Sequence, residues 1–362
     1  MPYTVLARAW RPTTFSELVG QEHVRSALTN ALEMGRLHHA LLFTGTRGVG
    51  KTSIARIVAK CLNCDVGVTS APCSNCSPCR SIDAGAFMDL VEVDGASRTK
   101  VESVRDWIDD VQFPPTQGRY KIYLIDEVHM LSTHAFNALL KTLEEPPPNI
   151  IFLLATTDPQ KLPATVISRC LRFDLVQLPV AKMVDRMRSV LRGEGIAFEL
   201  AGLMAVAHTA DGSMRDALSL LDQLISFGDG QVSEANARAM LGMIPRDRIV
   251  HLAELLSMHN VPALLGDARS LADLAPNYDH ILHELAGLFV NIAIRQVTDE
   301  VDDDVRDALE VLDRLSQTYT AQDLHLYYQI AIIGRRDLSL ALDAQAGFEL
   351  TLLRMLAFRP GS

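Results

Sequence analysis

The stretch that decides the fold is Gly45-Thr46-Arg47-Gly48-Val49-Gly50-Lys51-Thr52, which follows an apolar run at 40–44 and opens a helical pattern. The spacing Gly-x-x-x-x-Gly-Lys-Thr in that context is typical of a loop whose backbone N–H groups surround phosphate oxygens at a helix N-terminus. In such a loop Lys51 reaches the β- and γ-phosphates, and the Thr52 hydroxyl binds Mg²⁺. The alternative is a glycine-rich turn with a surface lysine, which does not explain why strand, spacing and helix coincide. We therefore predict nucleotide binding by this loop and the adjoining Ser53.

The region around the loop alternates short apolar runs with helical patterns up to about residue 175, which indicates strand-helix-strand units and a parallel sheet. We expect buried strands at 40–44, 90–93, 122–125 and 151–154, with helices near 50–61, 100–112 and 132–145. Asp126 and Glu127 end the third strand, at the edge where an open parallel sheet presents its ligand site. There we expect Asp126 to hold Mg²⁺ through water and Glu127 to polarise an attacking water. The alternative is a pair of ordinary strand-end acids that cap the next helix.

The strand signal disappears after residue 178, where apolar residues recur at three- and four-residue spacing. A glycine and a proline in Gly242-Met243-Ile244-Pro245 interrupt this helical pattern, and longer helices follow. We predict an α/β plus all-α chain with three domains. They are a nucleotide-binding domain at 1–178, a small helical domain at 179–242 and a third, helical domain at 243–362.

The composition agrees with a folded chain of several domains. The 362 residues include 48% apolar residues, enough to build real cores, and carry 34 Lys and Arg against 44 Asp and Glu. The net charge of −10 argues against binding to nucleic acid by bulk charge, although residues 1–60 are locally basic. There is no apolar run of membrane-spanning length, and no basic N-terminal segment precedes an apolar one. We expect a cytoplasmic protein without a membrane partner.

Four cysteines between the first helix and the second strand form a candidate metal site at 64–79: Cys64, Cys73, Cys76 and Cys79. Two C-x2-C spacings allow the thiolates to converge on one ion, and four thiolates complete the tetrahedral shell of structural Zn²⁺. An iron–sulfur cluster also uses four thiolates and is the alternative. Disulfides are not expected in the cytosol. We interpret Cys61 and Cys170 as buried free thiols.

Several motifs beyond the phosphate loop carry a resemblance to a known family. They are Leu6-Ala7-Arg8-Ala9-Trp10-Arg11-Pro12, Val19-Gly20-Gln21, Asp126-Glu127-Val128-His129, Thr156-Thr157, Ser168-Arg169-Cys170 and Gly212-Ser213-Met214-Arg215-Asp216. Together they resemble the AAA+ ATPases of the clamp-loader clade. The segments Ala96-Ser97-Arg98-Thr99-Lys100 and Phe136-Asn137-Ala138-Leu139-Leu140-Lys141-Thr142-Leu143-Glu144-Glu145-Pro146 narrow the resemblance to the gamma/tau family of bacterial DNA polymerase III subunits, over nearly the whole chain.

The resemblance implies roles for individual residues. Thr157 would be the first sensor near the γ-phosphate, and Arg215 the second sensor, reaching from the small helical domain. Arg169 would be an arginine finger offered to ATP bound by a neighbouring subunit, because charge that develops on the γ-phosphoryl oxygens requires a cation. The segment Val19-Gly20-Gln21 would lie against the adenine, with Arg11 and Pro12 nearby. His129 has no second metal ligand at a suitable spacing, and we interpret it as a solvated or core histidine.

The resemblance also implies an architecture and an activity. The fold would be an AAA+ parallel-sheet P-loop domain with a zinc insertion, a helical lid domain at 179–242 and an oligomerisation collar at 243–362. The chain would be an ATP- and Mg²⁺-dependent motor that opens the sliding clamp (beta) and loads it onto primed DNA. Its partners would be delta, delta-prime and further gamma/tau copies in a pentamer-like hetero-oligomer. Nothing in the chain resembles a nucleotidyl-transfer site, so a DNA polymerase activity would belong to the complex.

Alternatives to this activity are a branch-migration or helicase motor, a non-hydrolysing scaffold and a small-molecule phosphotransferase. Arg98 and Lys100 are candidate DNA-backbone contacts because they flank a predicted helix N-terminus. The spacing Thr99-x-x-Glu102 also reads as a capping box alone, and both interpretations can hold together.

Overall fold

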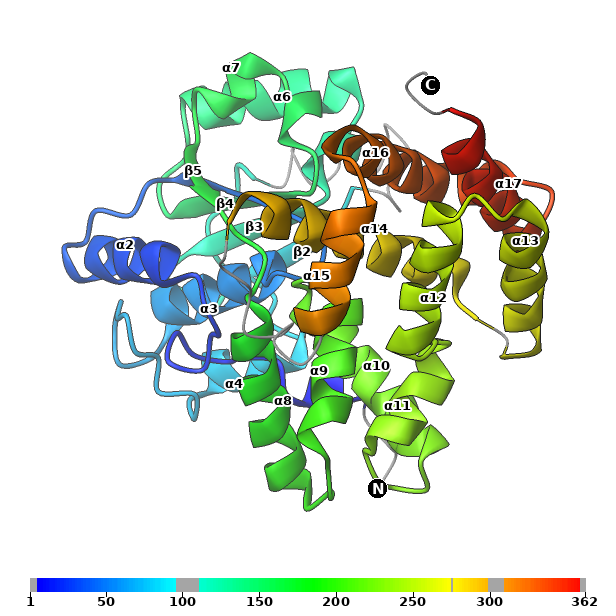
Figure 1. The fold of residues 1–362 in the computed structure, drawn as a ribbon. Coiled ribbons are helices and arrows are strands. Elements are labelled where there is room, and N and C mark those ends of the chain that lie inside the picture. The colour runs from blue at the N-terminus through cyan, green and yellow to red at the C-terminus, as the bar shows by residue number, and fades with distance from the viewer. Residues whose placement is uncertain (1–4, 96–110, 275, 299–308, 359–362) are drawn as a thin grey trace. The chain divides into compact units, whose positions relative to one another are not determined.

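The computed structural model describes residues 5–95, 111–274, 276–298 and 309–358. The chain divides into two compact units, Met1–Glu234 and Ala235–Ser362, which are described separately below. The first unit contains a parallel sheet covered by helices, and the second is helical in its described part (Figure 1). The predicted helix near 100–112 and the candidate DNA contacts Arg98 and Lys100 lie outside the described residues.

The sheet of the first unit has five described strands: β1 Ala40–Thr44, β2 Leu90–Asp94, β3 Lys121–Asp126, β4 Ile150–Thr156 and β5 Leu171–Asp174. Their order is β2-β3-β4-β1-β5, and every pair is parallel. The four predicted strands are confirmed. The sequence analysis missed β5, because this edge strand is largely exposed and lacks the apolar run of a buried strand.

The central strands β1 and β4 are buried along their whole length, as expected for a parallel sheet covered on both faces. Leu41 and Phe43 point into the core on one face, whereas Ala40 and Leu42 point into the core on the other. Successive side chains alternate between faces because a strand has a period of two. The apolar run at 40–44 is therefore used on both sides.

Helices cover each face of the sheet. The first core receives side chains from α2 Glu22–Glu33, α3 Lys51–Asn63 and α4 Ser77–Ala84. The second receives them from η1 Val128–Met130, α6 Thr133–Glu144 and α7 Ala164–Ile167, while the short η2 Pro159–Lys161 follows β4. The helices predicted near 50–61 and 132–145 are confirmed as α3 and α6.

The first unit also contains a helical subdomain built from α8 Val180–Glu194, α9 Leu200–Thr209 and α10 Met214–Phe227. Residues 5–12, here called the N-terminal strap, include α1 Leu6–Ala9 and pack on these helices. The backbone N–H of Leu6 donates to buried Asp222 Oδ2 at 2.7 Å. The strap is therefore fastened to α10.

Trp10 fastens the other end of the strap to α8. Its indole Nε1 donates to Glu194 Oε1 at 2.8 Å, and the Arg186 guanidinium lies 5.6 Å from the centre of the ring. Arg186 also donates to the Trp10 carbonyl at 3.1 Å. Gly193 makes room for the ring, because a Cβ atom built at this position would lie 2.5 Å from the nearest indole carbon.

The second unit is a helical core. Its elements are α12 Arg246–Ser257, α13 Val261–Ser270, η3 Leu271–Leu274, α14 Tyr278–Val297, α15 Leu309–Thr318, α16 Ala321–Asp337, η5 Leu338–Leu340 and α17 Ala344–Ala357. The helix α11 Glu234–Leu241 begins at the last residue of the first unit. Phe289, Tyr319 and Tyr327 pack as a buried aromatic cluster with ring centroids 5.6 to 5.9 Å apart. Among the described helices, none combines the length and the apolar character needed to span a bilayer.

A substitution at Gly193 tests the fastening of the strap. Replacing a helical glycine by alanine normally stabilises a protein by up to about 1 kcal/mol. We expect Gly193→Ala to destabilise instead, by about 1–3 kcal/mol, because the new methyl group overlaps the Trp10 ring. The checks are urea unfolding and Trp10 fluorescence.

The matched control is Gly287→Ala in α14, where nothing lies within 4 Å of the added Cβ. This variant should be as stable as the wild type or more so. An equal gain in stability from Gly193→Ala would show that Trp10 does not hold the strap against α8.

Candidate nucleotide-binding site and cysteine cluster

The phosphate loop joins β1 to α3 and adopts a conformation that needs glycine. Gly45, Gly48 and Gly50 have φ values of 142°, 79° and 108°, in the region where L side chains are strained. The helix α3 begins immediately after the loop, at Lys51. The loop therefore lies at a helix N-terminus, whose free N–H groups and dipole favour an anion.

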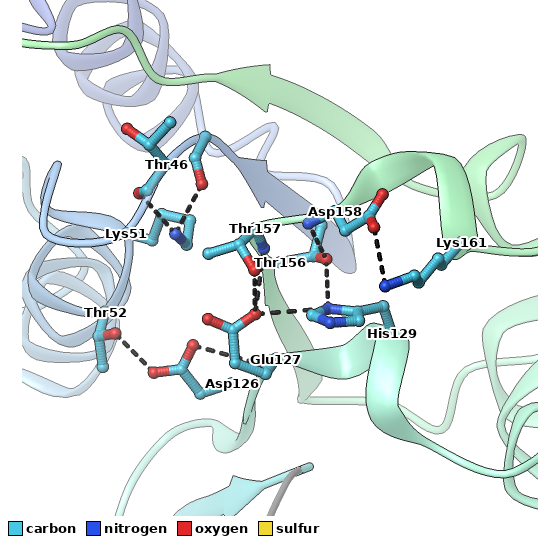
Figure 2. A network of polar contacts seen from close by, with 11 residues as sticks. Thr46, Lys51, Thr52, Asp126, Glu127, His129, Thr156, Thr157, Asp158 and Lys161 are labelled. Atoms are coloured by element: carbon cyan, nitrogen blue, oxygen red, sulfur yellow. Dashed lines mark hydrogen bonds and ion pairs between the residues drawn. The ribbon is translucent and has the colours of Figure 1, made fainter. Parts of the chain in front are cut away.

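The Lys51 side chain is buried and folds back over the loop. Its Nζ donates to the carbonyl oxygens of Gly45 at 2.8 Å and of Thr46 at 2.9 Å (Figure 2). Burial lowers the pKa of Lys51, and the carboxylates of Glu127 and Asp126 partly oppose this effect. The ammonium is thus held beside the loop by backbone oxygens that a bound phosphate can replace.

Thr52 and Asp126 lie side by side. The Thr52 hydroxyl donates to Asp126 Oδ2 at 2.8 Å, although the two residues come from different elements, α3 and the end of β3. A hydroxyl and a carboxylate are hard oxygen ligands of the kind that Mg²⁺ prefers. The donor set of these two side chains therefore fits the predicted magnesium site.

Glu127 is turned toward the end of the neighbouring strand β4. Its backbone is left-handed, with φ 47°, which is uncommon for a residue other than glycine. Its Oε2 accepts hydrogen bonds from the Thr157 N–H at 3.1 Å and the Thr157 hydroxyl at 2.8 Å. The structure thus brings the predicted water-polarising acid and the predicted first sensor into direct contact (Figure 2).

His129 belongs to the same polar network, which the sequence analysis missed. Its Nδ1 lies 2.9 Å from Thr156 Oγ1 and 3.4 Å from Glu127 Oε2, and the side chain is only 8% exposed. The interpretation as a solvated or core histidine is therefore incomplete, because the ring is buried beside Glu127. The only sequence signal was its position two residues after Glu127.

A cavity of about 480 Å³ lies in front of the loop, within the size range of small-molecule sites. One part is lined by the loop and the acids: Arg47, Gly48, Val49, Gly50, Lys51, Thr52, Ser53, Asp94, Asp126 and Glu127. The other part is lined by the strap (Ala7, Trp10, Arg11, Pro12), by the segment after it (Glu17, Leu18, Val19), by Leu178 and by the helical subdomain (Arg186, Met214, Arg215, Leu218). The sequence analysis did not assign Asp94 or Arg186 to the site.

Several predicted residues do not line this cavity: Gly20, Gln21, Gly45, Thr46, Thr157 and Arg169. Gly45 and Thr46 contribute their carbonyl oxygens to Lys51 instead. Gln21, predicted to lie against the adenine with Val19 and Gly20, has a buried side chain that is bonded to the backbone of Val176 through both amide atoms. Its side chain therefore joins the segment at 19–21 to Val176, which follows β5.

Cations converge on the cavity. Burial, and then the charges of Arg56 and Arg215, lower the pKa of Arg11. Lys51, Arg11 and Arg215 all line the same space, and Arg215 is supplied by the first turn of α10. Such a concentration of positive charge favours a polyanionic ligand.

The phosphate loop and α10 are in direct contact. A Cβ atom at Gly48 would overlap the Ser213 hydroxyl, so only glycine allows this approach. Ser213 caps α10, because its Oγ accepts a hydrogen bond from the Asp216 N–H. This contact explains how Arg215, far from the loop in sequence, reaches the cavity.

Arg169 does not line the cavity. It follows α7, and its guanidinium is half-buried, pairs with Glu144 at 2.6 Å and donates to the Thr165 carbonyl at 2.8 Å. The structure therefore does not bring Arg169 together with the nucleotide site of its own chain.

The four predicted metal ligands do converge. The sulfur atoms of Cys64, Cys73, Cys76 and Cys79 all lie within 4.8 Å of one another. Backbone N–H groups also point at two of them, at 3.4 Å each, from Cys73 to Cys64 and from Cys76 to Cys73. Four thiols in this arrangement with N–H donors to sulfur fit a tetrahedral metal ion.

The two remaining cysteines lie outside the cluster. Cys61 is buried as predicted, and burial raises the pKa of its thiol to about 12. Cys170 is a free thiol as predicted, but it is half-buried rather than buried. Its position between α7 and the exposed edge strand β5 leaves part of it accessible.

Lys60 fastens the cysteine cluster to α3. Its side chain is fully buried, and Nζ donates to Asp83 Oδ2 at 2.6 Å and to Ser74 Oγ at 3.1 Å. Ser74 lies between two of the clustered cysteines, and Asp83 lies on α4. The buried ammonium group of Lys60 therefore joins α3, which begins at the phosphate loop, to the cysteine segment through Ser74 and to α4 through Asp83.

The fold and the site define a P-loop nucleotide-binding protein with a helical subdomain over the loop, the architecture of AAA+ proteins. Three family models match successive parts of the chain. They describe the DNA polymerase III delta subunit at 20–179, the ATPase lid domain of a DNA polymerase III clamp loader subunit at 182–230 and domain III of DNA polymerase III subunits gamma and tau at 232–361.

Individual relatives agree with these models. The DNA polymerase III subunit tau of Escherichia coli is 52% identical over 99% of this chain and 56% of its own length. The DNA polymerase III subunit gamma of Buchnera aphidicola subsp. Baizongia pistaciae is 41% identical over 98% of this chain and 97% of its own. The chain belongs to the gamma/tau family of DNA polymerase III clamp-loader subunits. It spans about half the length of the tau relatives it matches.

A more distant likeness concerns the fold alone. The structure of the Thermotoga maritima RuvB Holliday junction branch migration motor superimposes with a TM-score of 0.50 at 18% identity. The match covers 74% of this chain and 86% of that chain. The AAA+ arrangement of sheet and helical subdomain is thus shared at low identity.

The Lys60–Asp83 pair leads to a stability prediction. Asp83→Leu leaves the buried ammonium of Lys60 without its partner, and we expect the free energy of unfolding to fall by about 1–3 kcal/mol. This is less than for a fully buried pair, because Asp83 is 34% exposed. The double variant Lys60→Met/Asp83→Leu should recover most of the loss, because no charge remains to be compensated. Urea unfolding measures both.

The matched control is the exposed pair of Lys182 and Glu22, at 2.5 Å. Lys182→Met should leave the unfolding midpoint unchanged, since exposed pairs contribute little. If the double variant is no more stable than Asp83→Leu, the unpaired buried charge of Lys60 is not the cause of the lost stability.

Proposed function

We propose that the chain is the ATP-hydrolysing motor subunit of a DNA polymerase III clamp loader, which opens a sliding clamp and places it on primed DNA. The observation that carries this proposal is the single cavity that collects the phosphate loop, Asp126, Glu127 and Arg215. The chain covers 97% of the length of one gamma-subunit relative, and its cavity holds the residue types that ATP hydrolysis requires. A non-hydrolysing scaffold would not need them.

The residues of the cavity would divide the work as follows. The loop N–H groups and Lys51 bind the β- and γ-phosphates, while Arg11 and Val19 lie on the base side of the cavity. Thr52 and Asp126 would hold Mg²⁺, which neutralises charge on the phosphates when bound. Glu127 then accepts a proton from the attacking water.

Arg215 and Thr157 would report the state of the nucleotide. Arg215 carries a positive charge from α10 to the γ-phosphate, so ATP favours one position of the lid residues. Thr157 lies between Glu127 and the end of β4, where it senses the γ-phosphate and the attacking water. Through these contacts ATP would bind one position of the lid residues more tightly than another, which is what shifting the population between the two positions requires.

Arg169 would complete the nucleotide site of a neighbouring subunit. It lies outside the cavity of its own chain, just after the end of α7, as a finger supplied in trans requires. Hydrolysis would then depend on assembly, because charge on the γ-phosphoryl group is stabilised only when a neighbour is present. The neighbours would be delta, delta-prime and further copies of this chain, with the sliding clamp (beta) and primed DNA as substrates of the assembly.

The remaining parts would have structural roles. We assign the domains to 1–178, 179–242 and 243–362, as nucleotide-binding domain, lid and oligomerisation collar. The cysteine cluster at 64–79 would hold one structural Zn²⁺, which closes the segment between α3 and α4.

Mixing two inactive variants tests the trans mechanism. Lys51→Ala removes the phosphate contact, and Arg169→Ala removes the finger. With partner subunits and primed DNA, we expect each variant alone to lose at least about 1,000-fold in ATP turnover, as loss of a finger typically costs. Their mixture should regain activity, because an intact nucleotide site meets an intact finger.

Co-assembly of the variants is verified by mass measurement of the complexes. Two inactive variants that co-assemble without any regain of turnover would mean that Arg169 acts within its own chain or only structurally. Arg172→Ala is the control, since this exposed arginine of β5 pairs only with Asp174 among the described residues.

Metal analysis tests the zinc assignment. We expect one zinc per chain, and Cys76→Ser should lose the metal and lower the stability, because three thiolates leave the tetrahedral shell open. Nucleotide binding through Lys51 should survive. Cys170→Ser, outside the cluster, should keep its zinc. Stoichiometric iron with visible absorbance would contradict the zinc assignment and indicate an iron–sulfur cluster.

A further inference from the structure

Among the residues that the structure describes, the carboxylate of Glu127 is held through one of its two oxygens. Its Oε2 accepts both Thr157 hydrogen bonds and lies 3.4 Å from His129 Nδ1. In the described part of the chain, no hydrogen bond or ion pair involves Oε1. Glu127 also lines the nucleotide cavity. The arrangement thus leaves one basic oxygen free while the other is anchored.

His129 is itself fixed by the end of β4. Its Nδ1 lies 2.9 Å from the hydroxyl of Thr156, which is fully buried and accepts a second hydrogen bond from the Asp158 N–H at 3.1 Å. The ring is 8% exposed and has little room to rotate. The hydrogen bond with Thr156 and the 3.4 Å contact with Glu127 Oε2 therefore involve the same nitrogen, and Figure 2 shows it between Thr156 and Glu127.

The backbone explains why these groups meet. Glu127 occupies a left-handed conformation before the single turn η1, which carries His129 back toward β4. Left-handed backbone in a residue other than glycine is costly and persists where the surroundings enforce it. The turn thus places the ring two residues after Glu127 and beside it, on the side away from the phosphate loop (Figure 2).

We propose that His129 is a positioning residue for Glu127: with Thr157 it anchors Oε2, so that Oε1 faces the attacking water. The inference rests on the proposed ATPase function, in which Glu127 is the general base. A base must lie within hydrogen-bond reach of the proton that it accepts, and a displacement of about 1 Å costs up to about 100-fold in rate. His129 acts through Glu127 and touches no reacting atom.

Three substitutions at His129 separate positioning from packing. Asparagine places its amide at the level of Nδ1, glutamine places it one bond farther out, near Nε2, and phenylalanine keeps the ring without any polar atom. We expect His129→Asn to keep turnover within about threefold of the wild type. His129→Gln and His129→Phe should lower kcat by about 10- to 100-fold in the assembly with primed DNA.

Nucleotide affinity and stability provide the contrast. The phosphate loop does not contact His129, so all three variants should bind a fluorescent ATP analogue within about twofold of the wild type. A purely structural role predicts that affinity, thermal midpoint and kcat fall together, and that result would overturn the proposal. Equal kcat in all three variants and the wild type, or equal losses in His129→Asn and His129→Phe, would overturn it too.

A double-mutant cycle tests whether His129 acts through Glu127. In single-turnover measurements, His129→Phe should lower the rate further by less than about twofold in a Glu127→Gln background, because the base it positions is gone. Full additivity would mean an independent role and would contradict the proposal. His134→Phe, a histidine outside this network, is the matched control and should leave kcat unchanged.

The same measurements distinguish the failure of the inference from the failure of the proposed function. If wild type and Glu127→Gln have the same negligible turnover in a verified assembly, Glu127 is not a base and the ATPase proposal fails. If the wild type hydrolyses ATP, Glu127→Gln does not, and the His129 variants match the wild type, only the positioning role fails.

Discussion

The parallel pairing of β4 with both β1 and β3 is the constraint on which the candidate site depends. Because these strands run in the same direction, their carboxyl ends open at one edge of the sheet. The phosphate loop follows β1, Asp126 ends β3 and Thr156 ends β4. A slip of one residue would turn the buried side chains of β4 to the opposite faces, so the core itself enforces the register.

The polar contacts at this edge use that register. Thr157 reaches Glu127 only because it follows the strand beside β3, and His129 returns to Thr156 through one short turn. Each acid near the loop is thus oriented by a group from another strand or helix, as with Thr52 and Asp126. Catalytic groups held in this way keep their geometry without the ligand, which is the basis of preorganisation.

A second set of contacts joins the phosphate loop to the helical subdomain. Gly48 approaches Ser213 so closely that a side chain at this position would overlap it. The strap, which is fastened by Leu6 and Trp10, packs on α8 and α10. Arg215 enters the cavity from this side. The lining of the cavity and the placement of α10 therefore share Arg215 and the close approach of Gly48 to Ser213.

The sequence by itself determined the elements whose signals are local: the phosphate loop at 45–52, the buried strands around it and the cysteine spacing from Cys64 to Cys79. It missed β5, whose residues are too exposed for an apolar run, and it could not indicate the hydrogen bonds of Gln21, whose partner Val176 is distant in the chain. The sequence also did not indicate the contacts of His129 with Thr156 and Glu127. Only the tertiary structure decided these points, because hydrogen bonds such as that between Thr157 and Glu127 join strands separated along the chain. Such contacts depend on strand order and register, which no local pattern encodes.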